Sequence, residues 1–333
     1  MSKQNHEVFI CIPYSNYDLK EFEIEYNLNI IMLKVKDEPK ILNKKNIFIS
    51  KIKFLMSYLF QYPKIKYIDS IYRTLNCLVG FDLLISIAAP HSIHWGVSKA
   101  IKRNKSIAKK WIADCGDPFM GSKVDMFANP FWFKRLEKDF CRNCDFITIP
   151  IKSAIQGYYP EFHSKIKIIP QGFKLDKIYS KTKVNNIPTF AYSGSFYRGN
   201  RDPRPFLDLL VEIDIDFLFI MYTPSWHELN IYKEKLGKKL EIREMVDRDS
   251  LLEVLVQMDF LVNFENSTIV QSPSKLIDYC IVKRPILNIS MNPSIELILE
   301  FLNSNYENRL PALDLSKYDI TNVAKQFTSL VEK

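Results

Sequence analysis

One segment, residues 270–279, combines residue types that can bind an anion. It lies between two apolar runs that predict strands, and Ser272 and Pro273 suit the N-cap and the first position of a helix. The unpaired amide groups and the dipole at a helix start attract negative charge, and Lys275 adds a full positive charge to the first turn. The sequence therefore predicts an anion site where this helix begins.

A carboxylate follows the predicted anion site by one helical turn. Asp278 lies three residues after Lys275 and four after Ser274, so the three side chains share a helix face. A carboxylate there can accept hydrogen bonds from both hydroxyls of a ribose, as in dinucleotide sites. The arrangement suits a nucleoside diphosphate, although the segment taken alone favours a capped helix with a routine Lys–Asp pair.

A second phosphate-binding pattern lies in residues 192–204, at the end of a predicted strand. Gly194, next to Ser195, permits a tight turn. Three guanidinium groups, whose forked geometry suits phosphate, follow within seven positions; they belong to Arg198, Arg201 and Arg204. The alternative is a solvated basic loop, but a glycine turn with three arginines, paired with a second strand–helix anion site, favours phosphate binding.

Polar side chains also end two predicted strands in the first half of the chain. His91 and His94 follow one strand and precede a basic helix, and Asp114 and Asp117 follow the next strand. A position at a strand end favours a functional role for the histidines, although a lone histidine is more often structural. The two aspartates either cap loops or contact a polar substrate.

The elements that must position these residues are short apolar runs alternating with helical stretches. Several runs lack polar alternation, as expected for parallel strands buried on both faces. The βαβ order predicts an α/β protein built on open, doubly wound sheets. The predicted strands span 7–12, 29–35, 82–87, 111–114, 145–149, 166–169, 189–193, 215–221, 240–242, 259–263 and 285–289.

A polar, lysine-rich connector at residues 174–188 interrupts this pattern. We therefore predict two Rossmann-like domains, residues 1–175 and 189–315, joined by a linker at 176–188, with a cleft between them. Ligands bind in such clefts near the carboxyl ends of the strands.

Composition and charge narrow the class of protein. A chain of 333 residues with 47% hydrophobic residues has material for a sizeable core, which argues against disorder and small disulfide scaffolds. The net charge of +8 is concentrated in residues 34–73, where ten basic and three acidic side chains give +7, and residues 99–110 add six bases and no acid. Such a surface suits nucleic acid, anionic lipid or an anionic substrate.

Residues 44–66 contain an apolar run with six lysines around it. The run is too short to cross a bilayer but can lie in its interface. A core helix with a solvated lysine rim explains the pattern about equally well. The chain start has no apolar segment with a cleavage site, so we expect a cytoplasmic protein with reduced thiols. Cys141 and Cys144 form a lone CxxC without two further ligands, so no metal site is predicted.

In order and spacing, these segments resemble the GT-B glycosyltransferases of the family 4 type. The resemblance covers residues 80–330 and rests on motifs that are each weak alone. They are P-H-S-x-H at 90–94, W-I-A-D-x-x-D-P at 111–118, I-P-Q-G-F at 169–173, G-S-F-Y at 194–197, and S-P-S-K with D-Y and R-P-I within 272–286.

The resemblance implies a GT-B fold whose final helix, residues 316–333, returns to the first domain. It implies retaining transfer of a sugar from a UDP- or GDP-linked donor to a glycan or lipid-linked acceptor, without an obligatory metal. The implied setting is bacterial surface polysaccharide or glycoconjugate assembly, in the cytoplasm or on the inner face of the membrane. A non-catalytic, degenerate GT-B protein held to a membrane or partner is the alternative, and nucleic-acid binding ranks last because no RNA or DNA motif is evident.

The resemblance also implies roles for individual residues. His94 would contact the donor sugar and its phosphate, which ranks it above His91, and Asp278 would bind the ribose. One or more of the three arginines would bind the diphosphate. The chain departs from the family pattern in three places: residues 13–17 lack a glycine, Val270 stands where a Glu is common, and Asp278 replaces the usual Glu.

Overall fold

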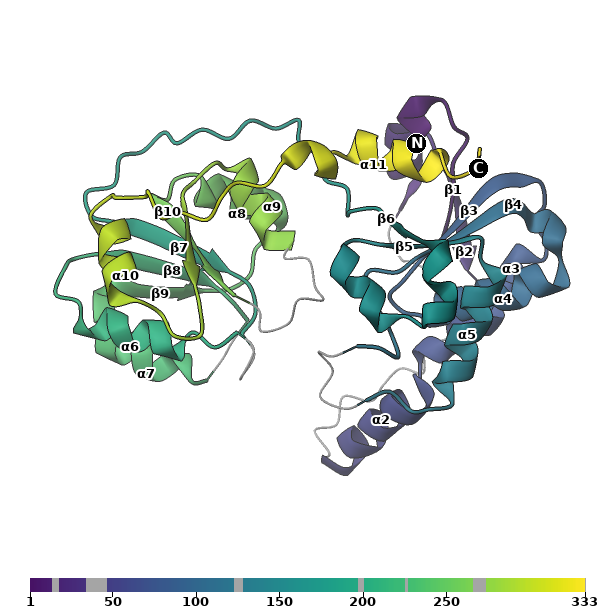
Figure 1. The fold of residues 1–333 in the computed structure, drawn as a ribbon, viewed down its shortest axis with the longest axis horizontal. Helices are drawn as coiled ribbons and strands as arrows, with labels where there is room; N and C mark the ends of the chain where they lie inside the picture. The colour runs from purple at the N-terminus through teal and green to yellow at the C-terminus, as the bar shows by residue number, and fades with distance from the viewer. Residues whose placement is uncertain are drawn as a thin grey trace. The chain divides into compact units, whose positions relative to one another are not determined.

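The computed structural model describes residues 1–13, 18–33, 47–122, 128–196, 201–224, 227–265 and 274–332, with the side chains of 47–49 and 274 excepted. The chain forms two compact units (Figure 1). The N-terminal unit comprises Met1–Gly172 and Ile320–Lys333, and the C-terminal unit comprises Phe173–Asp319. The stretch predicted as a linker, 176–188, belongs to the C-terminal unit.

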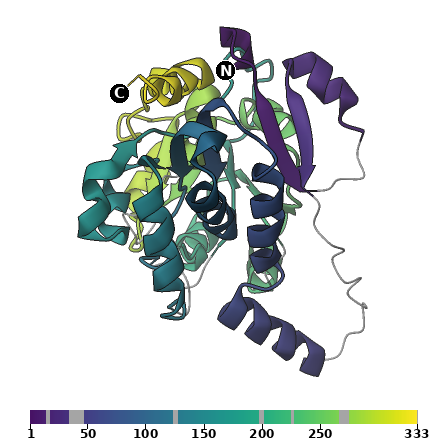
Figure 2. The same ribbon diagram turned by 90° about the vertical axis from the view of Figure 1, so that its right-hand side faces the viewer.

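The N-terminal unit is built on a four-stranded parallel sheet in the order β3-β4-β5-β6. A separate parallel pair, β1-β2, lies beside it, and Phe9 of β1 meets Phe81 of β3 edge to face at 5.3 Å (Figure 2). The strands are β1 (Phe9–Pro13), β2 (Asn29–Leu33), β3 (Phe81–Ile87), β4 (Ala108–Asp114), β5 (Phe146–Ile149) and β6 (Ile166–Ile168).

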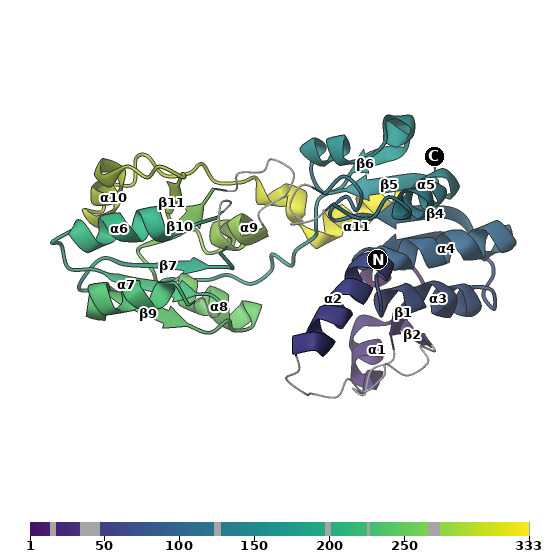
Figure 3. The same ribbon diagram turned by 90° about the horizontal axis from the view of Figure 1, so that it is seen from below.

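Two helices of this unit, α3 and α4, lie side by side (Figure 3). A core cluster joins Ile112 of β4 and Ile169 to Val323 and Phe327 of the C-terminal helix. The helices of the unit are α1 (Lys20–Tyr26), α2 (Ile47–Phe60), α3 (Tyr67–Leu75), α4 (Ser92–Arg103), α5 (Phe133–Asn143) and α11 (Ile320–Thr328).

The C-terminal unit holds a five-stranded parallel sheet in the order β11-β10-β7-β8-β9. The chain starts at the central β7, adds β8 and β9 on one side, and then crosses to β10 and β11 on the other. The order therefore reverses at β7, and ligands of doubly wound sheets bind at the carboxyl ends of the strands at such a reversal. The strands are β7 (Thr189–Ser193), β8 (Leu218–Tyr222), β9 (Leu240–Arg243), β10 (Phe260–Phe264) and β11 (Ile286–Ile289).

Alternating side chains of β7 enter two different cores, because successive residues of a strand point to opposite faces. Phe190 and Tyr192 join the cluster that packs against α6, α7 and α10, whereas Ala191 joins the cluster against α8 and α9 (Figure 1). The helices are α6 (Arg204–Glu212), α7 (Leu229–Leu236), α8 (Arg248–Leu255), α9 (Ser274–Ile281) and α10 (Ile295–Leu302).

Every predicted strand run overlaps an observed strand, and all pairings between strands are parallel in the described part of the chain. The predicted α/β class is therefore confirmed. Among the described helices, none combines the length and apolar character needed to cross a bilayer.

Candidate functional site

The strand-order reversal at β7 brings two of the predicted binding segments together. The glycine turn follows β7 directly, and α9 begins at Ser274 in the connection between β10 and β11. Arg198, Ser272 and Pro273 lie outside the described residues, as does the side chain of Ser274. The candidates of this site that the structure describes are Gly194, Ser195, Arg201, Arg204, Lys275 and Asp278.

The turn after β7 is held by hydrogen bonds to one carbonyl group. Gly194 has φ +144°, and a Cβ there would lie 2.9 Å from the hydroxyl of Tyr192, so only glycine fits without strain. Tyr192 Oη donates to the carbonyl oxygen of Ser195 at 3.1 Å, and Arg201 Nη1 donates to the same oxygen at 3.2 Å. Arg201 is thereby fixed against the glycine turn.

A buried tyrosine fastens α9 to the end of β7. Tyr279 Oη accepts a hydrogen bond from the main-chain nitrogen of Ser193 at 3.0 Å, and its side chain is fully buried. Burial raises the pKa of Tyr279, so its hydroxyl stays neutral. This contact sets the first turns of α9 beside the glycine turn, as the predicted diphosphate site requires.

Lys275 occupies an unusual environment for a lysine. Its ammonium lies 4.5 Å from the ring centroid of Tyr192 and 3.5 Å from the hydroxyl of that residue. Within the described part of the chain, no carboxylate forms an ion pair with it. Burial, and next the positive charge of Arg201, lower the pKa of Lys275 to about 6. Lys275 and the Arg201 guanidinium are therefore held close together, which is an arrangement that favours an anion.

Asp278, the predicted ribose ligand, already has a partner. Arg248 Nε donates to Asp278 Oδ1 at 2.8 Å, and the aspartate side chain is 17% exposed. Burial raises the pKa of Asp278 and the guanidinium lowers it. Arg248 begins α8, whose N-cap Asp247 accepts from the amide of Ser250. The sequence patterns above do not single out Arg248; its local signal is the Asp–Arg–Asp–Ser start of α8.

Arg204 is engaged within its own segment. Its Nε donates to both carboxylate oxygens of Asp202 at 2.9 Å, and this partner raises the pKa of the guanidinium. Both residues stand at the start of α6. Of the two described arginines, the structure thus brings Arg201, but not Arg204, into contact with the Ser195 turn.

Two asparagines outside the predicted motifs lie near the carboxyl ends of β10 and β11. They are paired in register, and Asn263 Nδ2 donates to Asn288 Oδ1 at 2.6 Å. Asn288 Nδ2 in turn donates to Glu265 at 2.5 Å. One asparagine near the end of each apolar run was the available signal.

His94 of the N-terminal unit is a fully buried residue with both ring nitrogens engaged. Nδ1 lies 2.8 Å from Ser86 Oγ and Nε2 lies 3.4 Å from Cys115 Sγ. Ser86 Oγ also accepts from Trp111 Nε1 at 2.8 Å. Burial lowers the pKa of His94 well below its usual value, so the ring is neutral. These contacts favour a structural role, and the donor-sugar role stays a prediction.

The other three candidates gather near His94, at the ends of β3 and β4. The ring of His91 lies 5.7 Å from that of His94, and burial lowers the pKa of His91 to about 4 despite a hydrogen bond with the Asp117 main chain. Asp114 accepts from Thr148 Oγ1 at 2.6 Å, and burial raises its pKa. Asp117 is exposed. Asp117 is thus the candidate of this group with the freest access to a substrate.

Comparison with known proteins identifies the fold. No protein-family model and no curated protein matches the sequence. The structure resembles HepE from Anabaena, solved with UDP-glucose, with a TM-score of 0.63 at 9% identity, covering 97% of this chain and 91% of that one. It also resembles the lipopolysaccharide outer core galactosyltransferase WaaB, with a TM-score of 0.58 at 10% identity, covering 96% and 87%.

A glycosyltransferase from Rickettsia africae gives a similar match, with a TM-score of 0.58 at 13% identity over 99% of this chain and 91% of that one. These neighbours are GT-B proteins, and the match extends over nearly the whole chain. The protein therefore has the GT-B fold, as the sequence resemblance predicted.

Proposed function

We propose that the protein is a glycosyltransferase that uses a nucleotide-sugar donor. One observation carries the proposal: Lys275 and Arg201 are held together at the strand-order reversal of a GT-B fold, and no carboxylate of the described residues forms an ion pair with Lys275. Asp278 stands one turn further along the same helix. This is the arrangement that a nucleoside diphosphate needs, with cations for the phosphates and a carboxylate for the ribose.

The proposed chemistry follows from charge. Departure of a nucleoside diphosphate from the sugar develops negative charge on the terminal phosphate. Lys275, Arg201 and the amide groups at the start of α9 would stabilise that charge, and they are already in place before the reaction. The Tyr192 and Tyr279 hydrogen bonds hold this arrangement, so little reorganisation is needed when charge develops.

Asp278 would accept hydrogen bonds from the ribose hydroxyls. A buried carboxyl tends to become neutral, and a neutral carboxylic acid is a weaker acceptor. Arg248 opposes that tendency by pairing with the carboxylate at 2.8 Å. We therefore assign Arg248 as a positioning residue that keeps Asp278 ionised and oriented.

The finer assignments rest on the resemblance to family 4 and on the neighbouring structures. We propose a retaining, hexosyltransferase-like reaction without an obligatory metal, on a glycan or lipid-linked glycan acceptor bound by the N-terminal unit. HepE was solved with UDP-glucose and WaaB is a lipopolysaccharide galactosyltransferase, which supports a UDP-linked donor and a role in bacterial surface polysaccharide or glycoconjugate assembly. A cytoplasmic site of action, peripheral to the membrane, accords with this role.

Donor binding and turnover test the proposal. Calorimetry and hydrolysis assays with UDP-glucose, UDP-galactose, UDP-N-acetylglucosamine and GDP-mannose should find at least one donor. Asp278→Asn should weaken its binding by about 1–3 kcal/mol, the scale of a hydrogen bond to a charged group. Asp216→Asn is the matched control, because it makes the same change at an exposed residue that precedes β8, at the opposite end of the strands from the site. Equal affinity of folded Asp278→Asn and wild type would remove the ribose assignment.

The alternative, a non-catalytic GT-B protein, draws support from the Asp278–Arg248 ion pair, which already occupies the carboxylate. It predicts donor binding without hydrolysis or transfer to any acceptor. Turnover of one donor that is lost in Lys275→Met would exclude it.

A further inference from the structure

Helix α2 presents an apolar surface to the outside of the N-terminal unit. Its sequence, IFISKIKFLMSYLF, is apolar on most sides, a pattern that normally indicates a buried helix. Its side chains are nevertheless exposed: Phe54 by 59%, Leu55 by 52% and Phe60 by 50%. Figure 2 shows this helix at the lower edge of the unit, away from the sheets.

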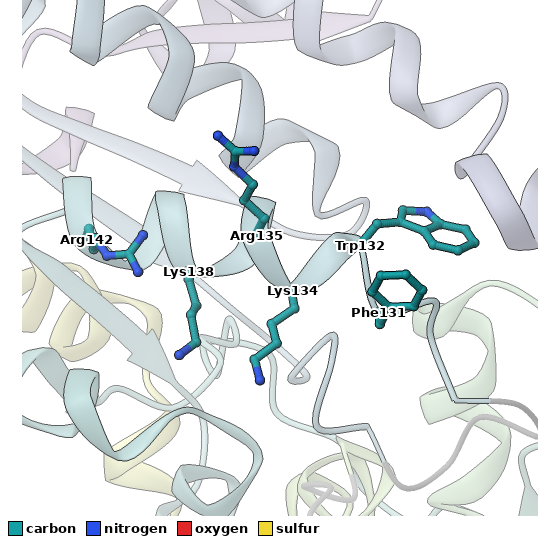
Figure 4. Close-up of a pocket in the computed structure, with 6 residues that line it drawn as sticks. All are labelled: Phe131, Trp132, Lys134, Arg135, Lys138 and Arg142. Atoms are coloured by element: carbon teal, nitrogen blue, oxygen red, sulfur yellow. The ribbon is translucent and has the colours of Figure 1, made fainter.

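The start of α5 continues this apolar surface. Phe131 is 79% exposed, and its ring lies 5.2 Å from that of Trp132, edge to face (Figure 4). Trp132 Nε1 donates to the carbonyl of Leu59 at 3.0 Å, and Tyr58 Oη donates to the carbonyl of Ala128 at 2.9 Å. Two hydrogen bonds therefore join segments about 70 residues apart into one surface, here called the α2–α5 face.

Cations follow the aromatic pair along α5. The open pocket beside Phe131 and Trp132 is also lined by four basic side chains of α5, and Lys134 and Lys138 extend to the same side of the helix (Figure 4). Lys138 pairs with Glu161 at 2.7 Å. In the described residues, no carboxylate pairs with the other three cations of the pocket or with two exposed lysines of α2. These five are Lys51, Lys53, Lys134, Arg135 and Arg142.

Acidic side chains of these two helices do not offset that charge. Helix α2 contains none. In α5, Glu137 is 1% exposed, and Asp139 is paired with Lys102 at 2.9 Å. The outward charge of the α2–α5 face is therefore positive, around a centre of exposed aliphatic and aromatic side chains.

We propose that the α2–α5 face docks on an anionic lipid bilayer, with Phe131, Trp132 and the apolar side chains of α2 entering the interface. Apolar side chains rimmed by lysine and arginine are what binding in the plane of an anionic membrane requires. The sequence hypothesis concerned residues 44–66 alone, of which 44–46 lie outside the described residues. The aromatic pair and cations of α5 are what the structure adds.

Two other partners fit the α2–α5 face less well: a second copy of this chain and a single-stranded nucleic acid. A symmetric contact with a second copy would set this cationic face against itself, because both partners of such a dimer use the same surface. A single-stranded nucleic acid would stack on aromatic rings and neutralise cations, but it would leave exposed leucine, isoleucine and methionine uncovered. A lipid interface accommodates both the cations and the aliphatic groups.

Vesicle co-sedimentation of the full chain tests the proposal. Binding to vesicles of phosphatidylcholine with 30% phosphatidylglycerol should exceed binding to phosphatidylcholine alone and should fall as salt rises. Lys134→Glu should lower the partition coefficient by about fivefold or more, the scale of one basic side chain near an anionic leaflet. Lys238→Glu, an exposed charge reversal in the C-terminal unit, is the matched control and should leave binding unchanged.

Phe131→Ser tests insertion separately from charge. The ring is mostly exposed, so the variant should fold, and it should bind the anionic vesicles more weakly. Ile178→Ser, at a residue 88% exposed in the other unit, should bind like wild type. A blue shift of tryptophan emission on binding should be lost in Trp132→Phe.

The proposal would be overturned by no sedimentation with anionic vesicles at low salt, by equal binding of Phe131→Ser and wild type, or by tighter binding to single-stranded RNA that Phe131→Ser abolishes. A concentration-dependent dimer in solution that Lys134→Glu strengthens would also overturn it. Donor affinity in Phe131→Ser should equal that of wild type. The tests of membrane binding and of the proposed reaction are therefore independent of each other.

Discussion

Lys275 is the residue whose local environment says most about function. An isolated lysine is charged at neutral pH, but burial and Arg201 lower the pKa of Lys275 to about 6. Its charge therefore costs folding free energy, and an incoming anion would offset that cost. Burial therefore keeps Lys275 partly neutral until an anion binds. No sequence pattern shows this, because burial depends on the tertiary structure.

Nucleotide-sugar binding should therefore take up a proton. Above pH 6 the free protein carries Lys275 largely neutral, and a bound diphosphate raises its pKa again, so affinity should fall as pH rises from 6 toward 9. Calorimetry at pH 7.5 in two buffers of different ionisation enthalpy measures the uptake, which should approach one proton per donor. Lys275→Met should show none. Identical binding enthalpies for wild type in both buffers would contradict the assignment.

The same shift has a consequence for stability. The folded pKa of Lys275 lies below its unfolded value, so the unfolded state binds more protons between the two. Stability should therefore rise with pH from about 6 up to the unfolded pKa, with the full cost present below about 6. In Lys275→Met this contribution is absent, and its unfolding free energy should depend less on pH.

For His94 we expect stability to suffer more than activity. His94→Ala removes a buried ring together with its contacts to Ser86 Oγ and Cys115 Sγ. The cost should be about 2–5 kcal/mol, the range of large-to-small substitutions in a core. Urea denaturation measures it, with specific activity determined on the folded fraction. Unchanged stability with activity lost would restore the donor-sugar role that the sequence resemblance implies.

At the scale of elements, one glycine explains how the C-terminal helix reaches its position. A Cβ on Gly172 would lie 2.5 Å from Ile320 Cδ1 and 3.2 Å from Ile320 Cα. Glycine at this place in the I-P-Q-G-F motif thus lets α11 approach the end of the β6 segment. Helix α11 then buries Val323 and Phe327 against Ile112 and Ile169.

Phe327→Ala should consequently destabilise the N-terminal unit. The ring is 9% exposed, and removing a buried Phe costs about 3–5 kcal/mol. Trp95, Trp111 and Trp132 belong to this unit, whereas Trp226 falls within the residue range of the other. In a Trp226→Phe background, tryptophan fluorescence during urea denaturation therefore follows the N-terminal unit. Ile178→Ala, at an exposed position of the other unit, should leave the midpoint of the urea denaturation curve unchanged. A Phe327→Ala midpoint equal to wild type would mean that α11 is dispensable for the unit.

At the scale of the whole molecule, the two units carry different kinds of surface. The C-terminal unit holds Arg201 and Lys275 close together beside the glycine turn, a local pair that suits a small anion. The N-terminal unit spreads unpaired cations over the α2–α5 face, which suits an extended anionic surface. This division matches the proposed roles, with the donor bound by one unit and a lipid-linked acceptor approached by the other.

Most of the fold was predictable from the sequence because parallel strands that are buried on both faces have continuous apolar sequences. Each predicted run overlaps a strand, and most segments that resemble GT-B enzymes follow a strand end, as after β3, β6, β7 and β10. The glycine at 194 and the Lys–Asp pair on α9 were predictable for a similar reason. Backbone freedom and helix spacing are local properties, and both leave a pattern within ten residues.

What only the tertiary structure decided depends on distance in the sequence. Arg248 meets Asp278 across 30 residues, Tyr279 meets Ser193 across 86, and Trp132 meets Leu59 across 73. Burial of His94 and exposure of α2 likewise depend on what packs nearby, and both depart from what their residue types suggest. The sequence determined which elements form and which residues end them, because these follow from local chemistry. Which side chains share a charge, a hydrogen bond or a surface was decided by how the elements pack.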